Sequence, residues 1–176
     1  MKRIQTIFFP VILLLISMAS PGQNLSTTIK VQAMDMASAL MKNDFATFSK
    51  YMHPNIVAFA GGKEKMKTKM DSAAIAMKEF GVSFKKYWIG SPGEIAHFKN
   101  QLQAVLPIST TMKTPLGELI AETSMIVISL DQGKNWYFID TNVYRVNKLK
   151  TILPDLSPNL VIPPPKQPQF VPEKTQ

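Results

Sequence analysis

Residues 116–142, LGELIAETSMIVISLDQGKNWYFIDTN, contain two apolar segments separated by a short polar turn. The first segment, 119–130, is rich in Ile, Val and Thr and has no interior Gly or Pro. The second segment, 136–141, is aromatic and alternates in polarity. Gly133, between them, can adopt the positive φ that a tight hairpin requires. The stretch predicts a β-hairpin, and because an isolated hairpin is not stable in water, we expect further strands or a helix to cover it.

The chain between Gly81 and this hairpin also has the pattern of β-structure. Strands are expected at 82–89, 94–98 and 101–112, separated by turns rich in Gly, Pro and Asn. In 101–112, apolar residues alternate with polar ones, which predicts a strand that is buried on one face. Pro107 lies within this strand and indicates an edge position or a bulge.

The part of the chain before Gly81 is mainly helical in pattern. A first helix is expected from Asn24, with one apolar face formed by Ile29, Ala33, Met36, Ala37 and Leu40. Asp44 is a suitable N-cap for a short second helix that ends before Pro54. Residues 56–60 form a short apolar run, for which we expect a strand.

A third helix is expected at 63–80, with Gly81 as its terminator. Its apolar face consists of Met66, Met70, Ala73 and Met77. Thioethers are ligands for soft metals such as monovalent copper, but no His or Cys accompanies these methionines. The helical spacing favours core packing, for which the flexible Met side chain is well suited.

The N-terminus has the pattern of an export signal, which we assign to residues 1–22. Lys2 and Arg3 form a basic start, the apolar run 7–16 follows, and small residues at 17–22 offer a cleavage site. The alternative is a membrane anchor, but the apolar run is shorter than the roughly 20 residues that a spanning helix needs. We therefore expect cleavage and a location in the periplasm or outside the cell.

The chain contains no cysteine, so a lipidated N-terminal cysteine, disulfides and thiol catalysis are all excluded. The net charge of +8 becomes about +6 without Lys2 and Arg3 (8 − 2). This basic balance suits an anionic ligand or surface, but the lysines are scattered, which favours an ordinary solvated surface. An exported chain is not expected to meet nucleic acid.

Proline dominates the last part of the chain: seven of the thirteen prolines lie in residues 151–176. This composition predicts an extended, Pro-rich tail with too few apolar residues for a core, either a docking peptide or an unstructured end. The tail after Ser157 is therefore expected to be dispensable for folding. Residues 23–150 remain as one domain of ordinary size.

The order of elements predicts an α+β fold, with three N-terminal helices packed on a curved antiparallel sheet. The segments 41–45 (MKNDF), 53–55 (HPN) and 61–62 (GG), with the hairpin 130–140, make residues 26–146 resemble the nuclear transport factor 2-like superfamily. This superfamily includes ketosteroid isomerase, scytalone dehydratase and many secreted bacterial proteins. The resemblance implies a cystatin-like cone around an apolar cavity, and a homodimer formed through the outer face of the sheet.

The residues expected to line such a cavity are Phe59, Tyr87, Phe98, Trp136, Phe138 and Asp140. Acid–base chemistry in it would use a carboxylate base opposite a hydrogen-bond donor, and the best set is Asp140 with Tyr87 or His97. A purely structural interpretation is also open, in which His53 caps a helix, His97 lies on a surface strand and Asp140 caps the hairpin. No sequence motif of defined spacing links these residues to a metal or a cofactor, and none is expected.

Two functions remain open. The first is an exported, non-catalytic binding module whose conical pocket holds a small apolar or anionic ligand. The second is a cofactor-independent lyase or isomerase of the dehydratase or ketosteroid isomerase type. The absence of HExxH, GxSxG and phosphate-binding glycine motifs disfavours hydrolases and nucleotide-dependent enzymes.

The hairpin itself provides a first prediction. Either Trp136 with Phe138 or Tyr137 with Ile139 should form its buried face, since alternate residues of a strand share one side of the sheet. Alanine in place of a buried aromatic residue there should lower the free energy of unfolding by about 3–5 kcal/mol, measured by thermal or chemical denaturation. An unchanged melting temperature for alanine at all four positions would show that the hairpin is not part of the core.

Overall fold

The computed structural model describes residues 21–144 and 146–173, so the expected signal peptide lies outside the described residues except for its last two positions. The helices are α1 (Pro21–Met41), α2 (Phe45–Phe48), the 3₁₀ turn η1 (Ser49–Tyr51), α3 (Pro54–Phe59), α4 (Lys63–Glu79) and α5 (Val146–Ile152). The strands are β1 (Ser83–Ile89), β2 (Ala96–Phe98), β3 (Gln101–Thr114), β4 (Gly117–Ser129), β5 (Tyr137–Asp140) and β6 (Gln169–Pro172). The fold is therefore α+β.

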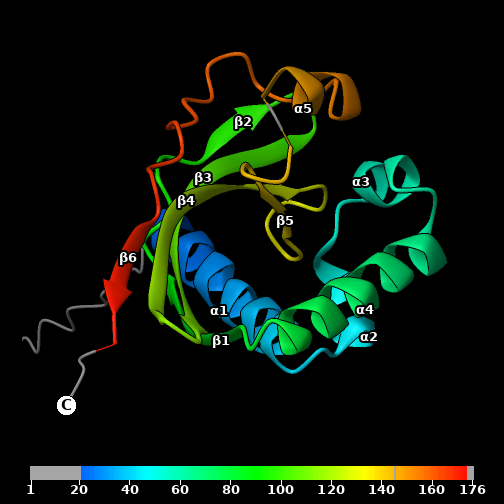
Figure 1. Ribbon diagram of the computed structural model, residues 1–176. Helices are drawn as coiled ribbons and strands as arrows, with labels where there is room; N and C mark the ends of the chain where they lie inside the picture. Colours follow the sequence, from blue (N-terminus) through cyan, green and yellow to red (C-terminus); the bar gives the residue numbers. More distant parts are fainter. Residues whose placement is uncertain (1–20, 145, 174–176) are drawn as a thin grey trace, which may run out of the picture.

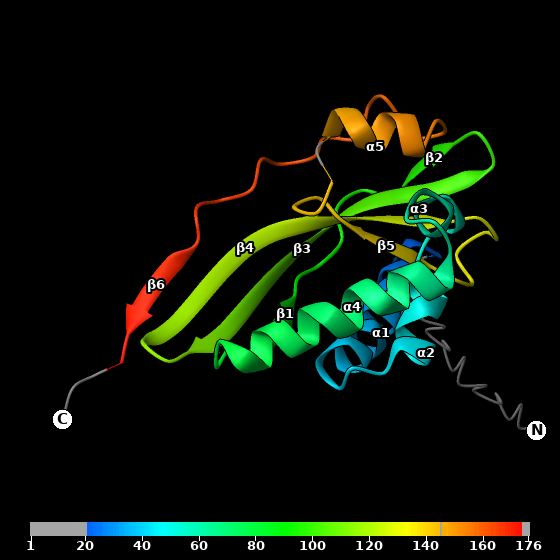
Figure 2. The same ribbon diagram turned by 45° about the vertical axis from the view of Figure 1, so that its right-hand side comes forward.

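Six strands form one antiparallel sheet in the described part of the chain. Its main path is β1-β3-β4-β5, while β2 pairs with β3, and β6 pairs with β4. The long β3 and β4 curve around α1, which lies against the concave face of the sheet (Figure 1). Helix α4 contacts α3, and α5 packs near β5 on the face of the sheet opposite α1 (Figures 1 and 2).

The expected alternation in β3 is confirmed. Its inward side chains are buried against α1, and they are Leu102, Ala104, Leu106 and Ile108. Gln103 points to the other face but is also fully buried, because the chain after α5 covers it. Its side chain accepts a hydrogen bond from Ser157 N–H at 2.8 Å and donates one to Asp155 O at 2.7 Å. Both polar atoms of the Gln103 side-chain amide therefore have hydrogen-bond partners, as buried polar atoms require.

The central hairpin is confirmed, with β4 pairing to β5 from Met125 opposite Asp140 to Ile128 opposite Tyr137. Gly133 has φ +89°, and its N–H donates to Ser129 Oγ at 2.8 Å. The buried Trp136 indole donates to Gly133 O at 3.0 Å. The turn is therefore held by its own side chains as well as by the ladder.

Side chains on both faces of β5 are buried. Trp136 and Phe138 pack toward α1, and Ile139 packs into a second cluster with residues of α3, α4 and α5. The hairpin face that carries Ile139 is therefore covered within the same chain.

Helix α1 agrees with the predicted apolar face, since Ile29, Ala33, Met36 and Ala37 are buried. It also bonds directly to the hairpin. The Gln32 amide donates to Lys134 O and accepts from Trp136 N–H, both at 2.8 Å.

The strand expected at 56–60 is wrong, because this segment forms α3. Pro54 occupies the first turn, where its fixed φ suits a helix and its missing N–H costs nothing. His53 is the N-cap, and its Nδ1 accepts a hydrogen bond from Asn55 N–H at 3.2 Å. Asp44 caps α2 as predicted, through Thr47 N–H at 3.0 Å.

Helix α4 lies where the third helix was predicted, and Gly81 ends it with φ +65°. The expectation that its methionine face is core is wrong for most of the face. Met66 is buried, but Met70 and Met77 are half-buried and Ala73 is exposed. Helix α4 lies beside the concave face of the sheet with a space between them, so this face lines a cavity instead of filling it.

The expectation of an unstructured Pro-rich tail is also wrong. Leu149, Ile152 and Leu153 enter the second core cluster, and Leu160 and Ile162 pack on it. The chain then runs along the sheet to β6, at the far end of β4 (Figure 2). The composition of the tail did not predict this order, because short apolar groups lie between the prolines. In addition, β6 is held by backbone pairing with β4, which composition does not reveal.

No helix in the described part of the chain combines the length and the apolar character needed to cross a membrane.

Gly117 provides a test of how the tail is attached. It has φ +148°, and a Cβ there would meet Val171 O at 2.2 Å, so only glycine allows β6 to approach this closely. We expect Gly117→Ala to detach β6, to lower the free energy of unfolding by about 1–3 kcal/mol, and to expose residues 169–172 to proteases. The control is Gly93→Ala, whose Cβ would make an ordinary contact at 3.6 Å. Equal proteolysis of the two variants would contradict the assignment.

Candidate functional site

A large cavity lies between the helices and the concave face of the sheet, at the end of β5. It encloses about 640 Å³, within the range of small-molecule sites. Its helical lining comprises Met36, Leu40, Phe48, Met52, Ile56, Phe59, Ala60, Met66, Lys69, Met70 and Ala73. The sheet and the loop after β5 supply Phe84, Tyr87, Thr110, Met125, Phe138, Ile139, Asp140, Val143 and Tyr144.

Most of this lining is apolar, and its few polar groups are the Asp140 carboxyl, the Lys69 ammonium and the hydroxyls of Tyr87, Thr110 and Tyr144. An apolar cavity with a small number of polar groups is the usual composition of a ligand site. Its methionines and the small side chains of Ala60 and Ala73 leave space that larger residues would fill.

Asp140 is placed in the cavity by the register of the sheet. It is the last residue of β5 and lies opposite Met125 of β4. Its carboxylate accepts a hydrogen bond from Asn142 N–H at 2.8 Å. Burial raises the pKa of Asp140 above its ordinary value, and the Asn142 N–H lowers it in part. The carboxyl is therefore closer to protonation than an exposed aspartate.

Tyr87 projects into the same cavity from β1. Its hydroxyl lies 4.0 Å from Met125 Sδ. Burial raises the pKa of the Tyr87 phenol, and the charge of Asp140 raises it further. The phenol is therefore a neutral hydrogen-bond donor throughout the physiological range. Asp140 and Tyr87 together offer one proton acceptor and one donor to a bound molecule.

The mouth of the cavity is partly aromatic. Phe59 is 50% exposed there and makes an edge contact with Tyr144, with ring centroids 6.2 Å apart. The Lys148 ammonium lies 4.9 Å from the centre of the Phe59 ring, a cation–π contact.

Of the residues predicted to line the pocket, four do so: Phe59, Tyr87, Phe138 and Asp140. Trp136 lies instead in the core cluster under α1, where it is 1% exposed. Phe98 is half-buried on the short β2, where Lys99 lies over its ring. His97 is exposed on β2 and does not reach the cavity, so it cannot act with Asp140.

The helical wall of the cavity was not predicted. Met66, Met70 and Ala73 have the spacing that predicted core packing, and spacing alone does not distinguish a core from a cavity wall. Ile56 and Ala60 were expected in a strand, so their position in the cavity wall was not predicted. An apolar face made of Met and Ala, with few large branched residues, was the only available signal of unfilled space.

His53 acts as a helix cap, in agreement with the structural interpretation. It is 4% exposed, and its ring meets Tyr137 edge-on with centroids 5.4 Å apart. Burial lowers the pKa of His53, so the side chain is neutral at physiological pH. It does not line the cavity.

In the described residues, no group of three or more His, Asp or Glu side chains is arranged to hold a metal ion. Comparison with known proteins gives no match to a protein-family model, to a curated protein or to a solved structure. The case for a function therefore depends on the geometry of the site.

The raised pKa of Asp140 predicts a pH dependence of stability. The folded state binds the proton of this carboxyl more tightly than the unfolded state does. The resulting stability is fully present below the unfolded pKa, near 3.8, and is lost as the pH rises through the folded pKa. Asp140→Asn keeps an oxygen to accept the Asn142 N–H and removes the charge. We therefore expect a higher melting temperature than wild type at pH 8.

This advantage of Asp140→Asn should shrink toward pH 3, as measured by thermal denaturation across the pH range. Tyr87→Phe is the control, because it alters the same cavity and keeps the carboxyl. Its melting temperature should follow the pH dependence of wild type between pH 3 and pH 8. An Asn variant less stable than wild type at pH 8 would show that the carboxylate is stabilising where it lies.

Proposed function

We propose that this chain is an exported, non-catalytic binding protein whose cavity holds a small, mainly apolar ligand. The observation that carries the proposal is the cavity of about 640 Å³ between α1, α3, α4 and the concave face of the sheet. An apolar cavity of this size offers a ligand many van der Waals contacts. Asp140 and Tyr87 would fix the orientation of the ligand through its polar group.

The finer features of the fold belong to the same proposal. A sheet curved into a cone, closed by N-terminal helices, is the architecture implied by the resemblance to the nuclear transport factor 2-like superfamily. The basic start and apolar run of residues 1–22 support export to the periplasm or beyond. The absence of cysteine is compatible with either location, because the cores are held by apolar packing alone.

A lyase or isomerase is the second candidate, and one observation favours it. Asp140 is a carboxyl of raised pKa that shares an apolar cavity with the phenol of Tyr87. A carboxylate base and a phenol donor are sufficient for proton abstraction next to a carbonyl group. Liquid chromatography with mass spectrometry of molecules that copurify with the protein distinguishes the two. A single retained compound supports binding, and a substrate together with its dehydrated product, or with an isomer of the same mass and different retention time, supports catalysis.

The binding proposal can be tested by filling the cavity. Ala73 lines it from α4, so Ala73→Trp should occupy part of the ligand space. We expect the neutral fluorescent probe aminoanthracene to bind the wild-type protein saturably, and the variant about tenfold more weakly, a loss of ~1.4 kcal/mol. The measurement is a fluorescence titration.

Ile75→Trp is the matched control, since Ile75 lies on the same helix, is 59% exposed and does not line the cavity. It should bind the probe as wild type does. Equal affinity of wild type, Ala73→Trp and Ile75→Trp would contradict the assignment of the cavity as the ligand site.

A further inference from the structure

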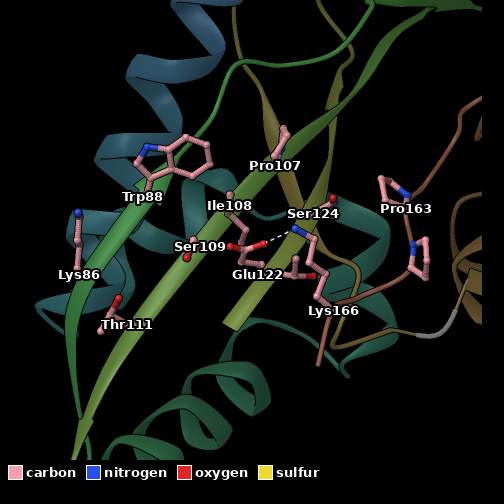
Figure 3. A pocket seen from close by; sticks show the side chains of 12 residues that line it. Lys86, Trp88, Pro107, Ile108, Ser109, Thr111, Glu122, Ser124, Pro163 and Lys166 are labelled. Carbon is pink, nitrogen blue, oxygen red and sulfur yellow. Dashed lines mark hydrogen bonds and ion pairs between the residues drawn. The ribbon is translucent and has the colours of Figure 1, made fainter. Parts of the chain in front are cut away.

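A second hollow lies on the outer face of the sheet, opposite the cavity, and we call it the outer groove. It encloses about 600 Å³ and is open to solvent along the sheet surface. Figure 3 shows its floor on β3 and β4, one wall on β1 and the other wall on the C-terminal segment. Its lining residues are Lys86, Trp88, Pro107, Ile108, Ser109, Thr111, Glu122, Thr123, Ser124, Pro163, Pro164 and Lys166.

The register of the sheet arranges these side chains in rows. Trp88 of β1 lies opposite Ser109 of β3, and Ser109 lies opposite Glu122 of β4. Pro107 and Ser124 form the next row on the same face. Ser109 and Thr111 lie two residues apart on β3 and face the same side, as alternate residues of a strand do, so the floor presents two hydroxyl groups along this strand.

Trp88 is the dominant side chain of the groove. It is 52% exposed, although a large aromatic residue is normally buried. A Cβ on Gly90 would meet the Trp88 ring at 2.9 Å, so the indole lies directly against this glycine. That contact fixes one edge of the ring and leaves the remainder available to a ligand.

The opposite wall is held in place by an ion pair. The Lys166 ammonium lies 2.5 Å from the Glu122 carboxylate, and Lys166 N–H donates to Glu122 O at 3.4 Å (Figure 3). Pro163 and Pro164 stand next to this pair. Leu160 and Ile162 pack on the second core cluster before the prolines, and β6 attaches the segment after them, so the wall is anchored on both sides.

The chemistry of the groove limits what it can bind. β3 is the central strand of the floor, and its main-chain groups belong to the ladders with β1 and β4, so a ligand that lies over it can bond only to side chains. These are hydroxyls, the ammonium of Lys86 and the Glu122–Lys166 pair. The ligand therefore needs many hydroxyl groups of its own and an apolar face for the indole.

We propose that the outer groove binds an extended oligosaccharide. A pyranose ring has an apolar face of C–H groups, which can stack on Trp88, and a rim of hydroxyls, which can bond to Ser109, Thr111 and Glu122. A proline-rich peptide is the competing ligand, since such peptides bind aromatic grooves. A peptide depends on main-chain hydrogen bonds as well, and β3, which is paired on both sides, offers it few partners.

The experiment uses the full exported chain and three probes: cellohexaose, chitohexaose and a galacturonate hexamer. The chain has two tryptophans, and Trp136 is 1% exposed, so a change in tryptophan fluorescence on binding reports on Trp88. We expect at least one probe to bind, with affinity confirmed by calorimetry. Trp88→Ala should bind about tenfold more weakly, while Trp88→Phe should retain most of the affinity.

Phe170→Ala is the matched control, because Phe170 is also half-exposed and lies on β6, outside the groove. It should bind as wild type does. Binding of none of the three probes, equal binding by Trp88→Ala, or binding of a decaproline peptide in their place would overturn the proposal. Ala73→Trp, which fills the cavity, should leave saccharide binding unchanged, so the two proposed sites are tested independently.

Discussion

The antiparallel ladder between β3 and β4 runs from Leu102 opposite Ser129 to Thr114 opposite Gly117. Side chains alternate along it, so every second residue faces α1 and the others face outward. The strands curve over this length, and the curvature gives the sheet a concave face that one helix alone cannot fill (Figure 1). The cavity, the outer groove and the place of α5 are all set by these two strands.

Neighbouring residues of one strand serve opposite faces of the sheet. Tyr87 points into the cavity, and Trp88, the next residue, forms the wall of the outer groove. A shift of β1 by one residue against β3 would exchange them, so the register preserves both sites at once. The irregularity between Phe84 and Lys86 shifts the register by one residue, so Phe84 and Tyr87, three residues apart, both line the cavity.

Local signals were sufficient to predict most of the strands and the central turn. Gly133 and the alternation of β3 act over a few residues, and both are found where they were expected. Helix α3 was missed because a short apolar run suits a strand as well as a helix. The ordered structure of the C-terminal tail was not predicted because the residues that it contacts lie far away in the sequence. For the candidate site, the sequence was sufficient to propose polar residues near the end of a strand. The space between α4 and the sheet depends on how these elements pack, so the sequence did not predict it.

The attachment of β6 has a consequence for how the chain avoids association with other molecules. Beyond its pairing with β5, the edge of β4 at Gly117–Ile120 would present unpaired N–H and C=O groups, and such edges promote aggregation. The β6 segment pairs with this edge and covers it within the same chain. The tail thus acts as a built-in cover, and Pro172 of β6 has no N–H to donate, which limits the pairing of the new edge with a further strand.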